Sequence, residues 1–204
     1  MQNIQLKDLL SDCFTGLIKS AYTSVDVADN AEQESVNLIK IKHITDTGIA
    51  LQGLEKVIIS DKYKKGKSKD FSLRSGDILL AARGEKIKMV LMTEKELVNH
   101  TTFDTNVILL RANQELIKPE VLLNYMLSPL GLNALKTIQK GGTAIKSINP
   151  RDIVTLTIPV PLLDEQEKMV KEHWAAKDLY LSTLVMAEKQ KQMTNSQIWS
   201  RFQG

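Results

Sequence analysis

Two segments of the chain concentrate lysine and arginine, the side chains that bind phosphate groups. Residues 61–92 hold nine Lys or Arg and four Asp or Glu, a net charge of +5 in a chain whose total is +3. Residues 136–151 hold four Lys or Arg and no acidic residue, a net charge of +4. Lysines near phosphates supply affinity, salt dependence and steering, but they do not distinguish one base from another. The charge distribution therefore predicts an anionic partner for this part of the chain.

Other residues in these two segments are of types that read DNA bases or approach a phosphate closely. Arg74 and Arg83 lie near the turns of a predicted hairpin, where a guanidinium can reach O6 and N7 of guanine. A Gly-Gly turn at 141–142 offers backbone N–H groups that can meet a phosphate. The candidate DNA-binding residues are Lys62, Lys64, Lys65, Lys67, Arg74, Arg83, Lys86, Lys88, Lys140, Thr143 and Lys146. The alternative for the lysine-rich run is a solvated loop that binds nothing.

Residue patterns typical of catalysis or cofactor binding are missing from the sequence. There is no G-x-G-x-x-G, and GGTAIKS (141–147) has Ile145 where a phosphate-binding loop needs glycine. The N-P-P-Y and D-P-P-Y tetrapeptides of methyltransferases, the (D/E)-x-K tripeptide of metal nucleases and G-x-S-x-G are all missing too. His43, His100 and His173 have no cysteine or carboxylate at ligand spacing. We therefore expect a non-catalytic protein with no metal and no cofactor.

Composition indicates a cytoplasmic protein. The single cysteine, Cys13, cannot form an intrachain disulfide, as is usual in reducing compartments. No window approaches the roughly 18 continuous apolar residues of a membrane-spanning helix. The first residues, MQNIQLKDLLSD, lack the basic-then-apolar order of a signal peptide.

The first two-thirds of the chain predicts a mixed α/β domain with several short strands. Apolar and polar residues alternate as in strands at 36–44, 48–60, 75–92 (a hairpin) and 103–112. Helical spacing then predicts helices at 119–127 and 128–140, each with proline at its first helical position. Residues 149–161 predict a short helical turn and an edge strand, because Pro159 and Pro161 cannot donate ladder hydrogen bonds.

A single long helix is predicted from Asp164 to about Phe202. Asp164 is a favourable N-cap, and Glu167 three residues later completes a capping-box spacing. At 1.5 Å per residue the helix would be roughly 55 Å long. Its apolar seam, which we expect to be a subunit interface, consists of Met169, Val170, Trp174, Leu181, Leu184 and Val185. The alternative is that the helix folds back on the domain before it.

Three motifs follow one another in a characteristic order along the chain. They are S-G-D-I-L at 75–79, a Gly-Gly-Thr segment at 141–143 and I-P-V-P-L-L-D-E-Q at 158–166. Together they resemble the DNA specificity subunit of type I restriction–modification systems, over about residues 3–200. The resemblance implies an α/β fold of the α+β type. In that fold a globular DNA target recognition domain (1–161) precedes a long coiled-coil-forming spacer helix (162–204).

The resemblance also implies partners. Such a subunit is not catalytic and directs DNA-adenine methyltransferase subunits, and for cleavage translocating endonuclease subunits, to a bipartite site on double-stranded DNA. The usual subunit has two heads and two helices, whereas this sequence has one of each and no internal repeat. A half-size unit of this kind would pair with itself as a homodimer through its helix, and twofold symmetry then predicts an interrupted palindrome as target.

Two alternatives to self-pairing stay open at the level of sequence. The chain could pair with a different half-subunit. In another class of function, it would be an interaction protein that binds the methyltransferase or a full specificity subunit and alters targeting without reading DNA itself.

Overall fold

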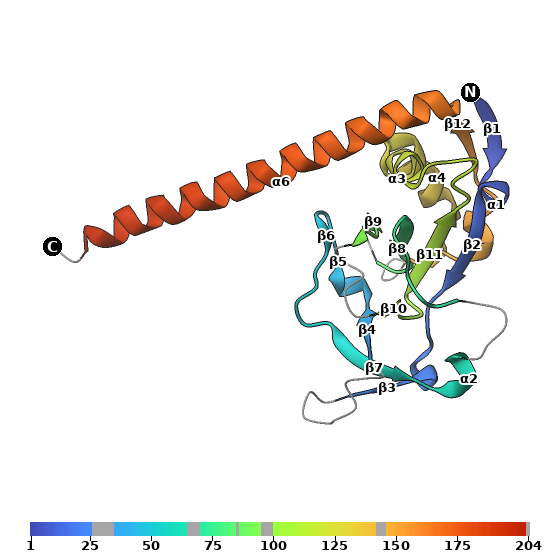
Figure 1. The fold of residues 1–204 in the computed structure, drawn as a ribbon, viewed down its shortest axis with the longest axis horizontal. Coiled ribbons are helices and arrows are strands. Elements are labelled where there is room, and N and C mark those ends of the chain that lie inside the picture. The colour runs from blue at the N-terminus through green and yellow to red at the C-terminus, as the bar shows by residue number, and fades with distance from the viewer. Residues whose placement is uncertain (26–34, 65–69, 85, 95–99, 142–145, 203–204) are drawn as a thin grey trace.

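The computed structural model describes residues 1–25, 35–64, 70–84, 86–94, 100–141 and 146–202. An antiparallel sheet lies at the centre, in the order β2-β11-β8-β9 (Figure 1). Its strands are Leu10–Thr15, Val107–Ala112, Asp77–Ala81 and Met89–Leu91. Every residue of β8, β9 and β11 is buried. Because side chains alternate between the two faces of a strand, such a run indicates a sheet that is covered on both faces.

Two apolar cores cover these faces. Leu80 and Leu110 lie in a core formed with α1 (Leu6–Leu9), α3 (Pro119–Leu127), α4 (Pro129–Ile138) and α5 (Pro150–Ile153). Leu79 and Leu109 lie in the other core, against Phe103 of a second sheet. The second sheet has the order β10-β4-β7-β3, with strands Thr101–Phe103, Val36–Ile39, Glu55–Ile59 and Tyr22–Ser24. The central sheet is therefore sandwiched between helices and a second sheet.

Smaller elements complete the described chain before residue 163, which we call the head. Strands β5 (Ile44–Thr45) and β6 (Gly48–Ile49) form a short hairpin. Strand β1 (Gln2–Gln5) pairs with β12 (Thr157–Val160), which brings the first residues of the chain beside the start of the last helix. The 3₁₀ turns η1 and η3 span Lys19–Ala21 and Ile41–His43. A short helix, α2, spans Asp61–Lys64.

Several elements agree with the sequence-based predictions. Helices α3 and α4 begin at Pro119 and Pro129, and the Gly131 N–H donates to Ser128 Oγ at 3.2 Å, which confirms the predicted cap. Strand β12 lies in a two-stranded sheet with Pro159 opposite Asn3, as expected for an edge strand. The predicted strand 36–44 is too long, because β4 ends at Ile39 and a 3₁₀ turn follows.

The predicted start of the long helix is wrong in detail. Helix α6 spans Leu163–Ser200, and its N-cap is Leu162, with no side-chain cap. The N–H groups of Glu165 and Gln166 donate to the Leu162 carbonyl, both at 3.0 Å. Asp164 is therefore inside the first turn, where its charge is favourable next to the helix dipole, and the predicted capping box with Glu167 does not form.

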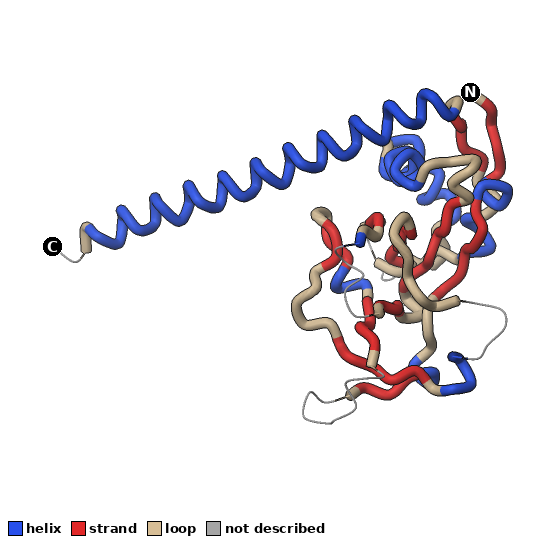
Figure 2. The backbone as a smooth tube through the Cα atoms, in the orientation of Figure 1, coloured by secondary structure: helices blue, strands red, loops and turns tan. Residues whose placement is uncertain are grey.

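Helix α6 crosses the head and then extends well beyond it (Figures 1 and 2). Its first half packs on α3, whereas every described residue from Ser182 onward is exposed. We call Ser182–Ser200 the free segment of α6. Within the described residues, no helix combines the length and the apolar character needed to cross a membrane.

Candidate nucleic-acid interface

The fold brings the two basic segments of the sequence side by side. Just past the end of β8, the Gly84 N–H donates to the Lys146 carbonyl at 3.2 Å. The Ile148 N–H donates to the Ala82 carbonyl at 2.8 Å, so 82–84 and 146–148 run antiparallel to each other. Both Arg83 and Lys146 are exposed. Among the described residues, no carboxylate forms an ion pair with either of them.

Lys140 joins the same ladder on its other side. Lys140 and Ser147 exchange two backbone hydrogen bonds, of 2.9 and 2.8 Å. The Lys140 ammonium lies 2.7 Å from Oδ2 of Asp152, although the lysine side chain is mostly exposed. We call Arg83, Lys140 and Lys146 the basic cluster. Arg83 and Lys140 both lie opposite Ser147 and so share one face of the ladder, whereas Lys146, next to Ser147, faces the other way. The positive charge of the cluster favours an anion such as a phosphate, and Asp152 offsets part of that charge.

The other candidate residues fall into four groups. Lys86 is exposed and Lys88 half-buried in the connection from β8 to β9, close to the basic cluster in the chain. Arg74 precedes β8, so the length of the strand separates it from Arg83, and its Nη2 lies 2.6 Å from Oδ2 of Asp70. The Lys62 ammonium lies 6.0 Å from the ring centroid of Tyr63, on α2. Lys65, Lys67 and Thr143 lie outside the described residues, as does the side chain of Lys64.

The S-G-D-I-L motif forms a buried ion pair and so has a structural role. The Arg111 guanidinium donates from Nε to Oδ1 of Asp77 at 2.7 Å and from Nη2 to Oδ2 at 2.8 Å. Asp77 Oδ2 also accepts the Arg74 backbone N–H at 2.7 Å, and Gly76 adopts φ +89°, which favours glycine. The hydrogen bonds that Arg111 donates to the Asp77 carboxylate raise the pKa of Arg111. Arg111 is thus held in the interior, away from the basic cluster.

The apolar seam of α6 is divided between the head and solvent. Met169, Val170 and Trp174 pack against the helix-covered core of their own head. The Trp174 indole N–H donates to Oε1 of Glu120 at 3.1 Å. The folded-back alternative therefore describes the first half of the helix. Leu181 is half-buried, and Leu184 and Val185 are exposed. A subunit interface along this seam stays a prediction. The exposed part of the seam begins at Leu184.

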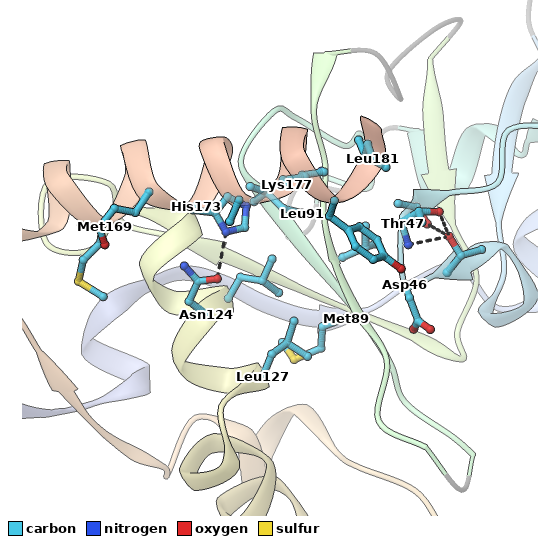
Figure 3. A pocket seen from close by; sticks show the side chains of 17 residues that line it. Asp46, Thr47, Met89, Leu91, Asn124, Leu127, Met169, His173, Lys177 and Leu181 are labelled. Atoms are coloured by element: carbon cyan, nitrogen blue, oxygen red, sulfur yellow. Dashed lines mark hydrogen bonds between the residues drawn. The ribbon is translucent and has the colours of Figure 1, made fainter. Parts of the chain in front are cut away.

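A pocket of about 490 Å³ lies where α6 leaves the head. Its walls come from α6, α3, β9 and the β5–β6 turn, and we call it the junction pocket (Figure 3). Met89, Leu91 and Leu127 make much of its surface apolar. His173 lies 3.0 Å from Asn124 through Nδ1 and Oδ1, and burial lowers the pKa of His173. The described residues contain no cluster of three or more His, Cys, Asp or Glu that could hold a metal.

Gln166, in the I-P-V-P-L-L-D-E-Q motif, has a structural role that the sequence patterns did not predict. Gln166, only 1% exposed, donates from Nε2 to the carbonyls of Leu116 at 3.1 Å and Pro161 at 3.0 Å. Its Oε1 accepts the Lys118 N–H at 2.8 Å. The sequence signal was a glutamine on the head-facing side of a helix next to Met169 and Val170.

The head consists of a central sheet, a helical layer and a second sheet, and a long helix projects from it. This is a mixed α/β head on a long helix. The family model described as type I restriction modification DNA specificity domain matches residues 13–172. The chain therefore belongs to this family of DNA specificity domains. No match was found among curated proteins.

Solved structures share the fold. The HsdS subunit from Thermoanaerobacter tengcongensis is 19% identical with a TM-score of 0.57, over 93% of this chain and 45% of that one. A chain from a structure of the type I R-M system, concerned with complex assembly and conformational transition, is 15% identical with a TM-score of 0.59. That match covers 96% of this chain and 42% of the other. The chain thus spans less than half the length of either protein.

Proposed function

We propose that this chain is a non-catalytic DNA specificity subunit of a type I restriction–modification system. Its target recognition domain, residues 1–161, reads one half of a bipartite DNA site. Its C-terminal segment, residues 162–204, contains α6 and pairs with a second copy or another half-subunit. The same segment docks DNA-adenine methyltransferase subunits, and endonuclease subunits where cleavage occurs. The proposal places the protein in the cytoplasm with its DNA.

The observation that carries the DNA-reading part is the basic cluster. Arg83 and Lys146 come from segments far apart in the chain, and backbone hydrogen bonds align them on one exposed ladder. Two cations that have no ion-pair partner among the described residues, carried on a hydrogen-bonded backbone, are suited to a phosphate chain. A guanidinium on such a support can also reach a guanine edge. The membership in a DNA specificity family supports the same function.

Double-stranded DNA binding by variants of the basic cluster tests the proposal. Arg83→Ala and Lys146→Ala should each weaken binding. Each lost phosphate contact should also make the negative slope of log K against log salt shallower by about 1. Lys189→Ala, on the free segment of α6, is the matched control because it removes an exposed lysine far from the cluster. Light scattering should show the same molecular mass for all variants.

The same variants separate this proposal from the interaction-protein alternative. A chain that only alters the targeting of another subunit needs no basic cluster on its head. DNA affinity and salt slope unchanged in both variants would exclude DNA reading through this surface. Mapping genomic methylation with the wild-type chain and with Arg83→Ala then shows whether the variant changes the half-site sequence that is methylated or lowers methylation uniformly.

A further inference from the structure

The face of α6 that lines the junction pocket continues along the free segment. Five turns of about 3.6 residues separate Leu181 from Trp199, so both lie on the same side of the helix. Leu181 lines the pocket, whereas Trp199 is 68% exposed. Phe202, 79% exposed, has its ring centroid 6.2 Å from that of Trp199. The helix therefore ends in an aromatic pair that has no neighbour from the described part of its own head.

The composition of this face limits how a second helix can lie on it. Leu184 and Val185 are apolar and exposed at the start of the free segment, and the aromatic pair is at its end. Between them, Glu188 and Gln192 lie on the same side by helical geometry. An antiparallel second helix that places Trp199 against Leu181 also places Gln192 opposite Glu188. At each end of this pairing Leu181 meets Trp199, whereas Leu184 and Val185 lie opposite Ser196 and Asn195. In the middle an amide meets a carboxylate, a polar pairing of the kind that fixes register.

A helix on this face would run toward the junction pocket. The pocket lies between α6 and the β5–β6 turn, and Leu181 is its last lining residue along the helix, near Thr47 in Figure 3. Its volume of about 490 Å³ falls within the roughly 300–1,000 Å³ of pockets that enclose small ligands, so an aromatic side chain fits. Aromatic side chains in well-packed pockets are the typical anchors of protein interfaces.

We propose that the junction pocket is the docking site for Trp199 and Phe202 of a second copy of this chain, whose α6 lies antiparallel to the first. The contact is isologous, so each copy inserts its aromatic pair into the pocket of the other. This inference rests on the helix pairing of the proposed function and adds the residues that set its register. Each copy thereby holds the other at both ends of the free segment, which fixes the distance between the two heads.

Tryptophan fluorescence tests the docking directly, because the chain has only two tryptophans. Trp174→Phe leaves Trp199 as the single emitter. Its emission should shift to shorter wavelength as the chain concentration rises, in step with a doubling of mass in sedimentation. Trp199→Ala should weaken the dimer by roughly 10- to 30-fold, the usual effect of truncating an aromatic anchor. Met186→Ala is the control, because Met186 is equally exposed and lies on the opposite side of the helix.

Variants in the pocket test the receiving side. Leu127→Lys places a charge on the pocket wall and should weaken the dimer as strongly as Trp199→Ala does. Leu130→Lys, on α4 and outside the pocket lining, should leave the dimer unchanged. Near- and far-ultraviolet circular dichroism of both variants shows whether the head remains folded.

Disulfide cross-linking between two different chains tests the register. A chain with Thr47→Cys is mixed with a chain carrying Phe202→Cys and oxidised. The free segment holds residue 202 about 30 Å beyond Leu181 in its own chain, so a bond between these positions joins two copies. Burial raises the pKa of Cys13 to about 12, so this cysteine stays a thiol during the reaction. Replacing Phe202→Cys by Met186→Cys should abolish the cross-link.

Three outcomes would overturn the inference. One is a monomer at all concentrations, and another is a dimer without the emission shift and the cross-link. The third is an emission shift that appears only after addition of a methyltransferase subunit, which would assign the pocket to that subunit. None of these outcomes affects the DNA-binding test with Arg83→Ala, so failure of the docking and failure of DNA reading are distinguishable.

Discussion

The side-chain oxygen of Gln166 accepts the backbone N–H of Lys118 at 2.8 Å, and this bond ties the start of α6 to the start of α3. Lys118 is the N-cap of α3 and has no side-chain cap of its own. Gln166 also donates to the carbonyls of Leu116 and Pro161. One buried amide therefore holds three segments together at the joint between head and helix, and it limits the angle at which α6 leaves the head.

Replacing Gln166 should destabilise the protein more than replacing a helix-capping side chain such as Ser128 would. Gln166→Leu leaves one N–H and two carbonyls without a partner in the interior, and each buried unsatisfied group costs about 1–3 kcal/mol. We expect a loss of at least about 3 kcal/mol in the free energy of unfolding, measured with urea. Gln190→Leu, at an exposed position of α6, should change the stability little. A loss in Gln166→Leu no larger than in this control would contradict the role of the amide.

The Asp77–Arg111 pair provides a second stability prediction. Asp77→Asn leaves the buried Arg111 guanidinium with only the more exposed Asp12 carboxylate, 3.4 Å from its Nη1, as counter-charge. Breaking a buried pair in this way costs roughly 3–5 kcal/mol. A double variant with Asp77→Leu and Arg111→Met should recover much of this loss, because neither replacement leaves a buried charge. Asp70→Asn, which breaks the exposed pair with Arg74, should cost less than about 1 kcal/mol. Equal losses for Asp77→Asn and Asp70→Asn would refute the distinction.

The stability of the head should fall as the pH drops below about 6.5. Burial lowers the pKa of both His43 and His173 from an ordinary value of 6.5, so the folded state favours neutral imidazoles. Their stabilising contribution is complete above the pKa of the unfolded chain. It is lost as pH falls from there through the lower pKa of the folded state, because unfolding then takes up protons. Urea unfolding at pH 7.5 and pH 5.5 measures the change. A double variant with both histidines changed to Gln should lose less stability over this range than the wild type does.

Asp152 should reduce the affinity of the basic cluster for DNA. Its carboxylate lies 2.7 Å from the Lys140 ammonium, so it competes with a phosphate for the same cation. Asp152→Asn should strengthen double-stranded DNA binding a few-fold and make the salt dependence steeper. Fluorescence anisotropy at two salt concentrations measures both effects. The combination of Asp152→Asn with Lys140→Ala is the control, and it should remove the gain. Weaker binding by Asp152→Asn alone would show that the carboxylate orients Lys140 rather than competing for it.

Local signals in the sequence determined much of the helical layer. Proline at the first position and the Ser128 hydroxyl act within one turn of the chain, so Pro119, Pro129 and Ser128 mark their helices without reference to tertiary structure. The hairpin around Arg83 and the edge strand with Pro159 follow equally local rules. The strands before residue 25 carry no such signal. They form because β12, β11 and β7 offer β1, β2 and β3 partners distant in sequence.

By itself the sequence determined that the chain carries two basic segments, a long helix with an apolar seam and the motifs of a DNA specificity domain. Only the tertiary structure decided that Arg83, Lys140 and Lys146 gather on one ladder while Arg74 lies at the other end of β8. It also decided that the seam is shared between the head and the free segment. The physical reason is that charge and helical period are properties of neighbouring residues, whereas strand pairing and helix packing depend on contacts between segments far apart in the chain.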